Sequence, residues 1–175
     1  NRMAALVFTG LALRLVTVDE LKRQMPYDII AIIAAALVIS DVMVASDTGG
    51  LLADVLLRGA DMFGPYGALG AVLLVTWILT ELMSNNAAAA LAFPIAIGVA
   101  ERLSLQPLPF VMAVLYGASC SFITPYGYQT NLMVMSPGRY TMGDYVRAGG
   151  PVAAAFLAVS LVAIPVFFPF LPLSR

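Results

Sequence analysis

Long apolar runs alternate with short polar segments along this chain, and the pattern predicts a set of membrane-spanning helices. A bilayer core of about 30 Å is crossed by about 20 apolar residues in a helix. Backbone groups inside a bilayer must satisfy their own hydrogen bonds, which favours helices. We therefore expect spans at about residues 3–18, 28–45 and 152–171. The chain starts part-way into the first apolar run, which predicts that it is a fragment of a longer protein.

Residues 51–63 carry charges every three or four positions, opposite a side of leucine, valine and phenylalanine. This pattern predicts a short helix lying at the membrane interface. Glycine-containing segments flank it on both sides. Residues 47–50 predict a break before the helix, and Gly64-Pro65-Tyr66-Gly67 predicts a turn after it.

A polar stretch from Thr80 to Asn86 lies between two apolar arms, residues 68–80 and 87–100. One continuous helix would place several polar groups near the centre of a very long span. A re-entrant hairpin over about 68–100 would instead enter and leave the membrane on one side, with the polar tip at depth. We favour the hairpin, because non-helical backbone at that depth is tolerated where it is buried in protein or lines a wet cavity.

A second polar stretch, Thr124 to Asn131, follows an apolar segment that is rich in small residues. Pro125 and Gly127 predict an interruption of the helix at this point. The sequence therefore predicts a discontinuous helix over about 110–136, followed by a polar interfacial stretch over 139–150. Amide and hydroxyl groups at membrane depth are costly unless they bind something. We expect the two polar stretches to bind an ion and a solute.

Composition supports a multi-pass membrane protein and excludes other classes. Apolar residues make up 61% of the chain and charged residues 11%, against about 45–50% and about 25% in soluble domains. The chain has no histidine, which argues against histidine-ligated metals and histidine-based acid–base chemistry. A net charge of −1 without a basic stripe gives no reason to expect a nucleic-acid partner. The hairpin tip has no paired acids, so we do not expect an enzyme.

The residue types at the two breaks suit a cation and an anion together. Helix breaks free backbone carbonyls that can coordinate a bare cation, and they create helix N-termini that attract anions. Neither break contains lysine or arginine, so a bound cation would supply the positive charge that an anion needs. Two plainer interpretations stay open. Asparagine and serine in membrane helices often only bond to neighbouring helices, and Glu81 is either a proton-coupling carboxylate or a structural acid bonded to backbone donors.

Two motifs in this chain resemble those of the divalent anion/sodium symporters, the sodium-coupled dicarboxylate and sulfate carriers of the ion transporter superfamily. Ser84-Asn85-Asn86, followed by AAAALAFP, resembles the hairpin motif of the family's second repeat. ASCSFITPYGYQTNLMV, followed by PGRYTMGDYVRAGG, resembles the second broken helix and its exit. The resemblance covers the chain from about residue 15 onward. It implies an all-α membrane fold, in which residues 1–175 form the C-terminal one of two inverted repeats.

The resemblance also implies site residues. A Na⁺ site would be formed by Thr80, the backbone of Met83, Asn85 and Gly127. The substrate would be faced or framed by Ser84, Asn85, Asn86, Tyr128, Gln129, Thr130 and Asn131. Asn86 replaces the motif threonine, and Tyr128-Gln129-Thr130 replaces the Thr-Pro-Pro of dicarboxylate carriers. Both departures bear on which anion is bound.

The expected function is Na⁺-coupled uptake of a divalent anion, sulfate or a dicarboxylate, by alternating access. The resemblance implies a bacterial inner (plasma) membrane protein that is completed by an N-terminal repeat and forms a homodimer. One alternative is a proton-coupled antiporter, or a metalloid or anion exporter, of the same superfamily, with Glu81 or Asp41 carrying protons. A second alternative, of a different class, is a membrane scaffold that transports nothing.

Overall fold

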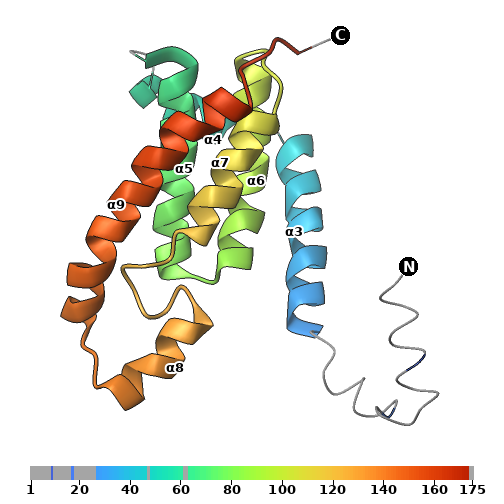
Figure 1. Cartoon of the computed structure of the whole chain (residues 1–175). Coiled ribbons are helices and arrows are strands. Elements are labelled where there is room, and N and C mark those ends of the chain that lie inside the picture. The colour runs from blue at the N-terminus through green and yellow to red at the C-terminus, as the bar shows by residue number, and fades with distance from the viewer. Residues whose placement is uncertain (1–8, 10–16, 18–26, 47, 61–62, 174–175) are drawn as a thin grey trace. The chain divides into compact units, whose positions relative to one another are not determined.

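A computed structural model describes residues 9, 17, 27–46, 48–60 and 63–173. Residues 1–31 and residues 32–175 form two compact units. The described part is built of helices (Figure 1), as expected for an α-helical membrane protein. They are α3 (Tyr27–Ala45), α4 (Thr48–Ala60), α5 (Gly64–Leu82), α6 (Asn85–Arg102), α7 (Leu108–Ser119), α8 (Gln129–Gly138) and α9 (Met142–Phe167). The predicted span over 3–18 lies outside the described residues apart from Thr9 and Thr17.

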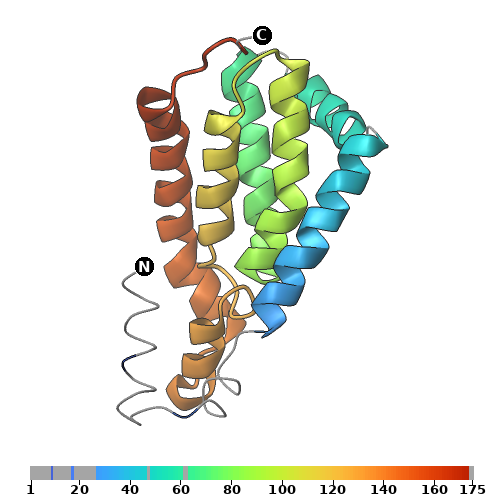
Figure 2. The same cartoon turned by 90° about the vertical axis from the view of Figure 1, so that its right-hand side faces the viewer.

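Helices α5, α6 and α7 lie side by side and form the centre of the second unit (Figure 2). Their contact faces carry mainly alanine, valine and leucine, and α4 adds Ala53, which is fully buried. Small residues let helices approach closely. At Gly117 in α7 an added Cβ would lie 2.9 Å from both the Leu73 carbonyl oxygen and the Thr76 Cβ of α5. This approach brings the last turn of α7 against α5.

Two predicted interruptions are helical instead. Thr48–Gly50, within the predicted break at 47–50, begin α4. Gly64–Gly67, predicted as a turn, is the first turn of α5. Proline is accepted there because the first-turn N–H groups have no partner within the helix. A long-range contact adds support, since the Tyr66 and Phe170 rings meet edge to face with centroids 5.1 Å apart.

The last helix also differs from its predicted extent. It begins at Met142 because Thr141 caps it, and the Thr141 and Asp144 side chains each accept from the other's backbone N–H. It ends at Phe167, and the residues after it turn back along the loop between α6 and α7. There the Gln106 N–H donates to the Leu171 carbonyl over 2.8 Å. The interfacial stretch predicted over 139–150 is thus largely the start of α9.

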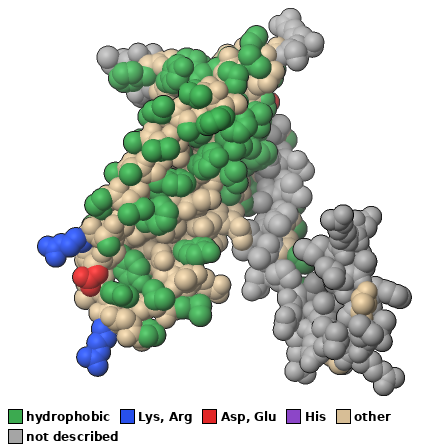
Figure 3. All heavy atoms as spheres, viewed as in Figure 1, with side chains coloured by type: hydrophobic (Ala, Val, Ile, Leu, Met, Phe, Trp, Pro, Cys, Tyr) green, Lys and Arg blue, Asp and Glu red, His purple; other side chains and the backbone are tan. Residues whose placement is uncertain are grey.

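Among the described helices, α5 and α9 are long and apolar enough to cross a bilayer. The surface of α9 supports a lipid-facing position, because Figure 3 shows hydrophobic side chains spread along it. Val162, Val166 and Phe167 are each more than two-thirds exposed. Exposed apolar surface of this extent is unusual in a soluble monomer and normal where lipid covers it.

Candidate functional site

The first part of the site is the hairpin tip, which we define as Met83 and Ser84 between α5 and α6. The Met83 N–H donates to the Leu79 carbonyl over 3.0 Å and so closes the last turn of α5. Ser84 is the N-cap of α6, and its hydroxyl accepts from the Ala87 N–H at 3.4 Å. Both ends of the tip are therefore fixed by contacts within a few residues.

The second part is the break, residues 120–128, between α7 and α8. Gly127 brings the break directly against the end of α5. An added Cβ at this position would collide with the Thr80 carbonyl and the Ser121 hydroxyl. Asn131, in the first turn of α8, donates to the carbonyls of Ser121 and Thr124 over 3.2 and 3.3 Å. The helical interruption predicted at Pro125 and Gly127 is thus present, and α8 begins at Gln129.

Glu81 joins the two parts. Its carboxylate accepts backbone N–H groups of the break: those of Phe122 and Ile123 at 3.1 Å and that of Thr124 at 2.8 Å. The Trp77 indole N–H donates to it at 3.3 Å, and the Thr124 hydroxyl donates to the Glu81 carbonyl at 2.8 Å. Among the described residues, the hydrogen-bond partners of this buried carboxyl group are all donors. These contacts match the structural-acid interpretation of Glu81.

Three oxygen atoms gather around the Asn85 side-chain amide where α5, α6, α7 and the break meet; we call the three oxygens and this amide the oxygen cluster. The oxygens are Thr80 Oγ1 and the carbonyl oxygens of Ala118 and Gly127. The fully buried Thr80 hydroxyl lies 2.7 Å from both Asn85 Oδ1 and the Ala118 carbonyl, although it has one proton to donate. With the Asn85 amide turned over, its nitrogen donates to Thr80 Oγ1, Ala118 and Gly127 over 2.7, 3.1 and 3.0 Å. The Asn85 amide atom that faces the cluster is therefore surrounded by the oxygens of Thr80, Ala118 and Gly127.

The helix ends around the cluster have a consistent polarity. Thr80 lies in the last turn of α5 and Ala118 in the last turn of α7. The C-terminal end of a helix carries the negative end of its dipole and unpaired carbonyls. Two such ends meeting at the oxygen cluster make this place favourable for a cation.

A polar cavity of about 400 Å³ adjoins the cluster through Asn85. It is lined by Asn85, Ser119, Ser121, Phe122, Tyr128, Thr130 and Asn131. Asn85 begins α6, and Thr130 and Asn131 lie in the first turn of α8. Helix N-termini present free N–H groups and the positive end of the dipole. The cavity is therefore a place where an anion is favoured.

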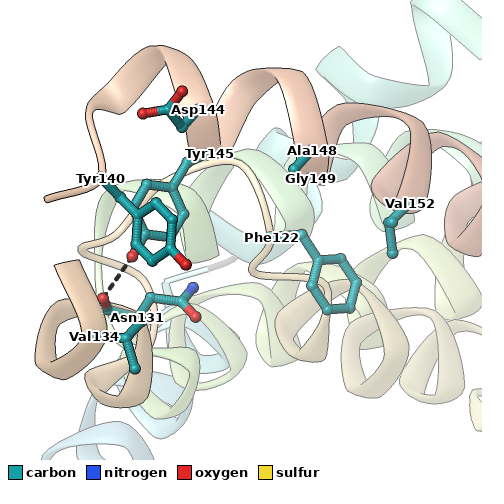
Figure 4. A pocket seen from close by; sticks show the side chains of 9 residues that line it. All are labelled: Phe122, Asn131, Val134, Tyr140, Asp144, Tyr145, Ala148, Gly149 and Val152. Carbon is teal, nitrogen blue, oxygen red and sulfur yellow. Dashed lines mark hydrogen bonds between the residues drawn. The ribbon is translucent and has the colours of Figure 1, made fainter. Parts of the chain in front are cut away.

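An apolar cavity of about 410 Å³ lies on the other side of Asn131, between α8 and the start of α9 (Figure 4). Phe122, Tyr140 and Tyr145 provide aromatic walls. The Tyr145 hydroxyl donates to the Asn131 carbonyl over 2.7 Å and so ties α9 to α8. Asn131 and Phe122 line both cavities.

The predicted site residues fall into two groups. Thr80, Asn85 and Gly127 converge at the oxygen cluster, and Tyr128, Thr130 and Asn131 line the polar cavity with Asn85. The other predicted residues are their chain neighbours in the tip or in the first turns of α6 and α8: Met83, Ser84, Asn86 and Gln129. Sequence reasoning did not select the Ala118 carbonyl or Ser121. Both belong to a run of small residues before the break, which is more readily interpreted as helix packing.

Relatives of this chain are transporters. It is 36% identical over 149 residues, 85% of its length, to an uncharacterized transporter of Synechocystis and covers 24% of that protein. It is 37% identical over 108 residues, 62% of its length, to an uncharacterized transporter of Escherichia coli and covers 18% of it. It is 32% identical over 143 residues, 81% of its length, to sodium/sulfate cotransporter 1 of Chlamydomonas reinhardtii and covers 16% of it. The chain thus spans a quarter or less of these relatives.

These similarities define the class as membrane transporters, not enzymes. The chain belongs to the citrate transporter family, CitMHS, whose family model matches residues 2–174. The kinship with anion carriers that the two motifs indicate is confirmed by this match and by relatives named sodium/sulfate cotransporters.

Proposed function

We propose that this chain forms half of the binding site of a secondary active transporter that takes up a divalent anion together with Na⁺. The observation that carries the proposal is the adjacency of the oxygen cluster and the polar cavity. Two helix C-termini meet at the oxygen cluster, and two helix N-termini meet at the polar cavity. A site for a cation and a site for an anion therefore share Asn85.

Na⁺ fits the oxygen cluster in chemistry and charge. Its ligands would be Thr80, Asn85 and the Gly127 carbonyl, with the Met83 backbone from the tip completing the set. Unwound carbonyls and helix C-terminal ends are the groups that bind Na⁺ in transporters with broken helices. In the orientation that satisfies its hydrogen bonds, the Asn85 amide nitrogen lies among the oxygens of Thr80, Ala118 and Gly127. Cation binding would turn the amide so that its oxygen faces the ion.

A divalent anion fits the polar cavity. Asn85, Thr130 and Asn131 supply side-chain hydrogen-bonding groups at the start of α6 and α8. Ser84, Asn86, Tyr128 and Gln129 lie in the same turns and would frame the solute. Without a lysine or arginine at either break, the bound Na⁺ supplies the attractive charge. Sulfate is favoured by the names of the Chlamydomonas relatives and a carboxylate substrate by the family's name.

The complete carrier would hold a second, N-terminal repeat with its own tip and break. We propose that α5 and α6 form a re-entrant hairpin and that the two inverted repeats provide alternating access. The carrier would lie in a bacterial inner membrane as a homodimer. This chain covers 16% to 24% of three of its relatives, which leaves room for a second repeat.

Proton coupling through Glu81 is the competing mechanism, and transport measurements separate it from Na⁺ coupling. Uptake of radiolabelled sulfate, succinate and citrate would be followed in proteoliposomes containing the complete transporter. We expect accumulation driven by an inward Na⁺ gradient and a loss of at least about tenfold in Asn85→Ala, which removes a ligand of both sites. Accumulation driven by a pH gradient alone would establish proton coupling. Absence of any gradient-driven uptake would favour a scaffold.

A further inference from the structure

Ser121 has a buried hydroxyl whose position is not explained by packing. The residue is 5% exposed, and its Oγ has no hydrogen-bond partner among the described residues. Buried hydroxyl groups are nearly always hydrogen-bonded, because leaving one unpaired forfeits its interaction with water. Alanine would fill this place without that cost. An unpaired hydroxyl here therefore indicates a ligand.

The hydroxyl lies beside Gly127, whose carbonyl belongs to the oxygen cluster. A Cβ on Gly127 would overlap both Ser121 Oγ and the Thr80 carbonyl oxygen, so these two oxygens flank the same small space. The Thr80 carbonyl belongs to the last turn of α5, where carbonyls lack donors from their own helix. Ser121 thus occupies space that a side chain at position 127 would otherwise take. Its hydroxyl oxygen lies at the place where α5 and the break meet.

The chemistry of the surroundings decides what ligand the hydroxyl suits. Its neighbours are the carbonyl end of α5 and the backbone of the break, and Asn85 lines the same polar cavity. A group of neutral oxygens at two helix C-termini has acceptor capacity in excess of its donors. A cation resolves that excess for all of them at once.

We propose that Ser121 Oγ is an additional ligand of the bound cation. This inference rests on the proposed Na⁺-coupled function and goes beyond the ligands Thr80, Met83, Asn85 and Gly127. Because Ser121 is in the break and Thr80 in α5, one ion held by both ties the break to the hairpin. Loss of this oxygen weakens Na⁺ binding and leaves the anion contacts at α6 and α8 in place.

The test compares Ser121→Ala with wild type in the complete transporter. In proteoliposomes the Na⁺ concentration for half-maximal uptake should rise by at least about tenfold, with the KM for the anion at saturating Na⁺ nearly unchanged. Ser121→Thr, which keeps the hydroxyl, should stay closer to wild type. Ser160→Ala removes another buried serine hydroxyl, in α9, and should leave the Na⁺ dependence unchanged.

Thermal stability gives a readout that a packing role would not produce. In choline, Ser121→Ala should melt at or above the wild-type temperature, because an unpaired buried hydroxyl has been removed. Addition of Na⁺ should raise the melting temperature less than in wild type, since ligand stabilisation depends on affinity.

Two other results would overturn the inference. Unchanged Na⁺ dependence with a raised anion KM would assign the hydroxyl to the anion, and no change in either would make Ser121 a packing residue. If wild-type uptake itself ignores Na⁺, the proposed function fails first, and the inference fails with it.

Discussion

The hairpin tip and the break meet at one site, but they are held in shape in different ways. The tip has two residues between its helices, and its bonds to Leu79 and Ala87 are local. The break has nine residues, 120–128, and is held by Asn131 of α8 and by Glu81, whose partners in the break lie 41 to 43 positions further along the chain. The tip is therefore defined by its own sequence, whereas the break takes its shape from another helix. Damage to one distant carboxylate should harm the break more than damage to a local cap harms the tip.

The largest effect is expected at Glu81. Glu81→Gln places an amide donor among the backbone N–H groups of Phe122, Ile123 and Thr124, so that at least one of them loses its acceptor. Each unpaired buried group costs about 1–3 kcal/mol. We expect a markedly lower melting temperature and loss of uptake that high Na⁺ does not restore. Differential scanning fluorimetry and uptake assays would measure both.

The proton-coupling interpretation makes the opposite forecast for the same variant. A Glu81→Gln protein with normal stability and Na⁺-independent uptake that no longer responds to pH would show that Glu81 carries protons. Glu101→Gln is the matched control, because that acid lies at the end of α6, away from the break. It should behave as wild type in both assays.

A smaller effect, confined to one contact between α5 and the break, is expected at Gly127. Gly127→Ala forces a Cβ into the Thr80 carbonyl and the Ser121 hydroxyl, so the break must shift away from α5. Backbone cannot yield as a flexible side chain does, and overpacking of this kind typically costs about 1–3 kcal/mol. We expect Na⁺-driven uptake to fall by at least about tenfold, with less loss of stability than in Glu81→Gln.

Gly143→Ala is the control for Gly127→Ala. Its added Cβ would meet the Thr141 hydroxyl at 3.7 Å, an ordinary contact. Glycine also lowers helix stability relative to alanine by about 0.5–1 kcal/mol, so this variant should be as stable as wild type or slightly more so. If both glycine variants transported normally, close contact between the break and α5 would not be needed for the site.

The same contrast decides what the sequence can predict. The tip is evident from Ser84-Asn85, because the cap and the helix after it are adjacent in the chain. Pro125 and Gly127 likewise predict that a helix breaks. The role of Glu81 does not follow from its neighbours, because its partners in the break are backbone groups that only the fold brings to it. The start of α5 does not follow from its local sequence either, since Tyr66 packs on Phe170 from the far end of the chain.

The oxygen cluster was predictable in part. The motif resemblance selects Thr80, Asn85 and Gly127, and the structure brings them together. It does not select the Ala118 carbonyl, because a backbone oxygen has no sequence signal and becomes a potential ligand only where α7 ends. Ser121 is similar: as a small residue in an apolar run it suits helix packing, and its unpaired hydroxyl is apparent only from the three-dimensional arrangement.

The smallest effect is expected at Ser84, where a local cap and a proposed substrate contact involve the same hydroxyl. Ser84→Ala removes the bond from the Ala87 N–H, and the loss of an N-cap costs about 0.5–2 kcal/mol. At 3.4 Å this bond is long, so the stability cost of Ser84→Ala should be near the low end of that range.

Ser84→Gly separates the two roles, because glycine is a tolerated N-cap that loses only a few tenths of a kcal/mol. If the hydroxyl serves only the tip, Ser84→Ala lowers the melting temperature slightly, Ser84→Gly barely does, and both keep the wild-type KM for the anion. We expect instead that both variants raise that KM by about threefold or more, because the exposed hydroxyl still has its proton to donate to an anion at the start of α6.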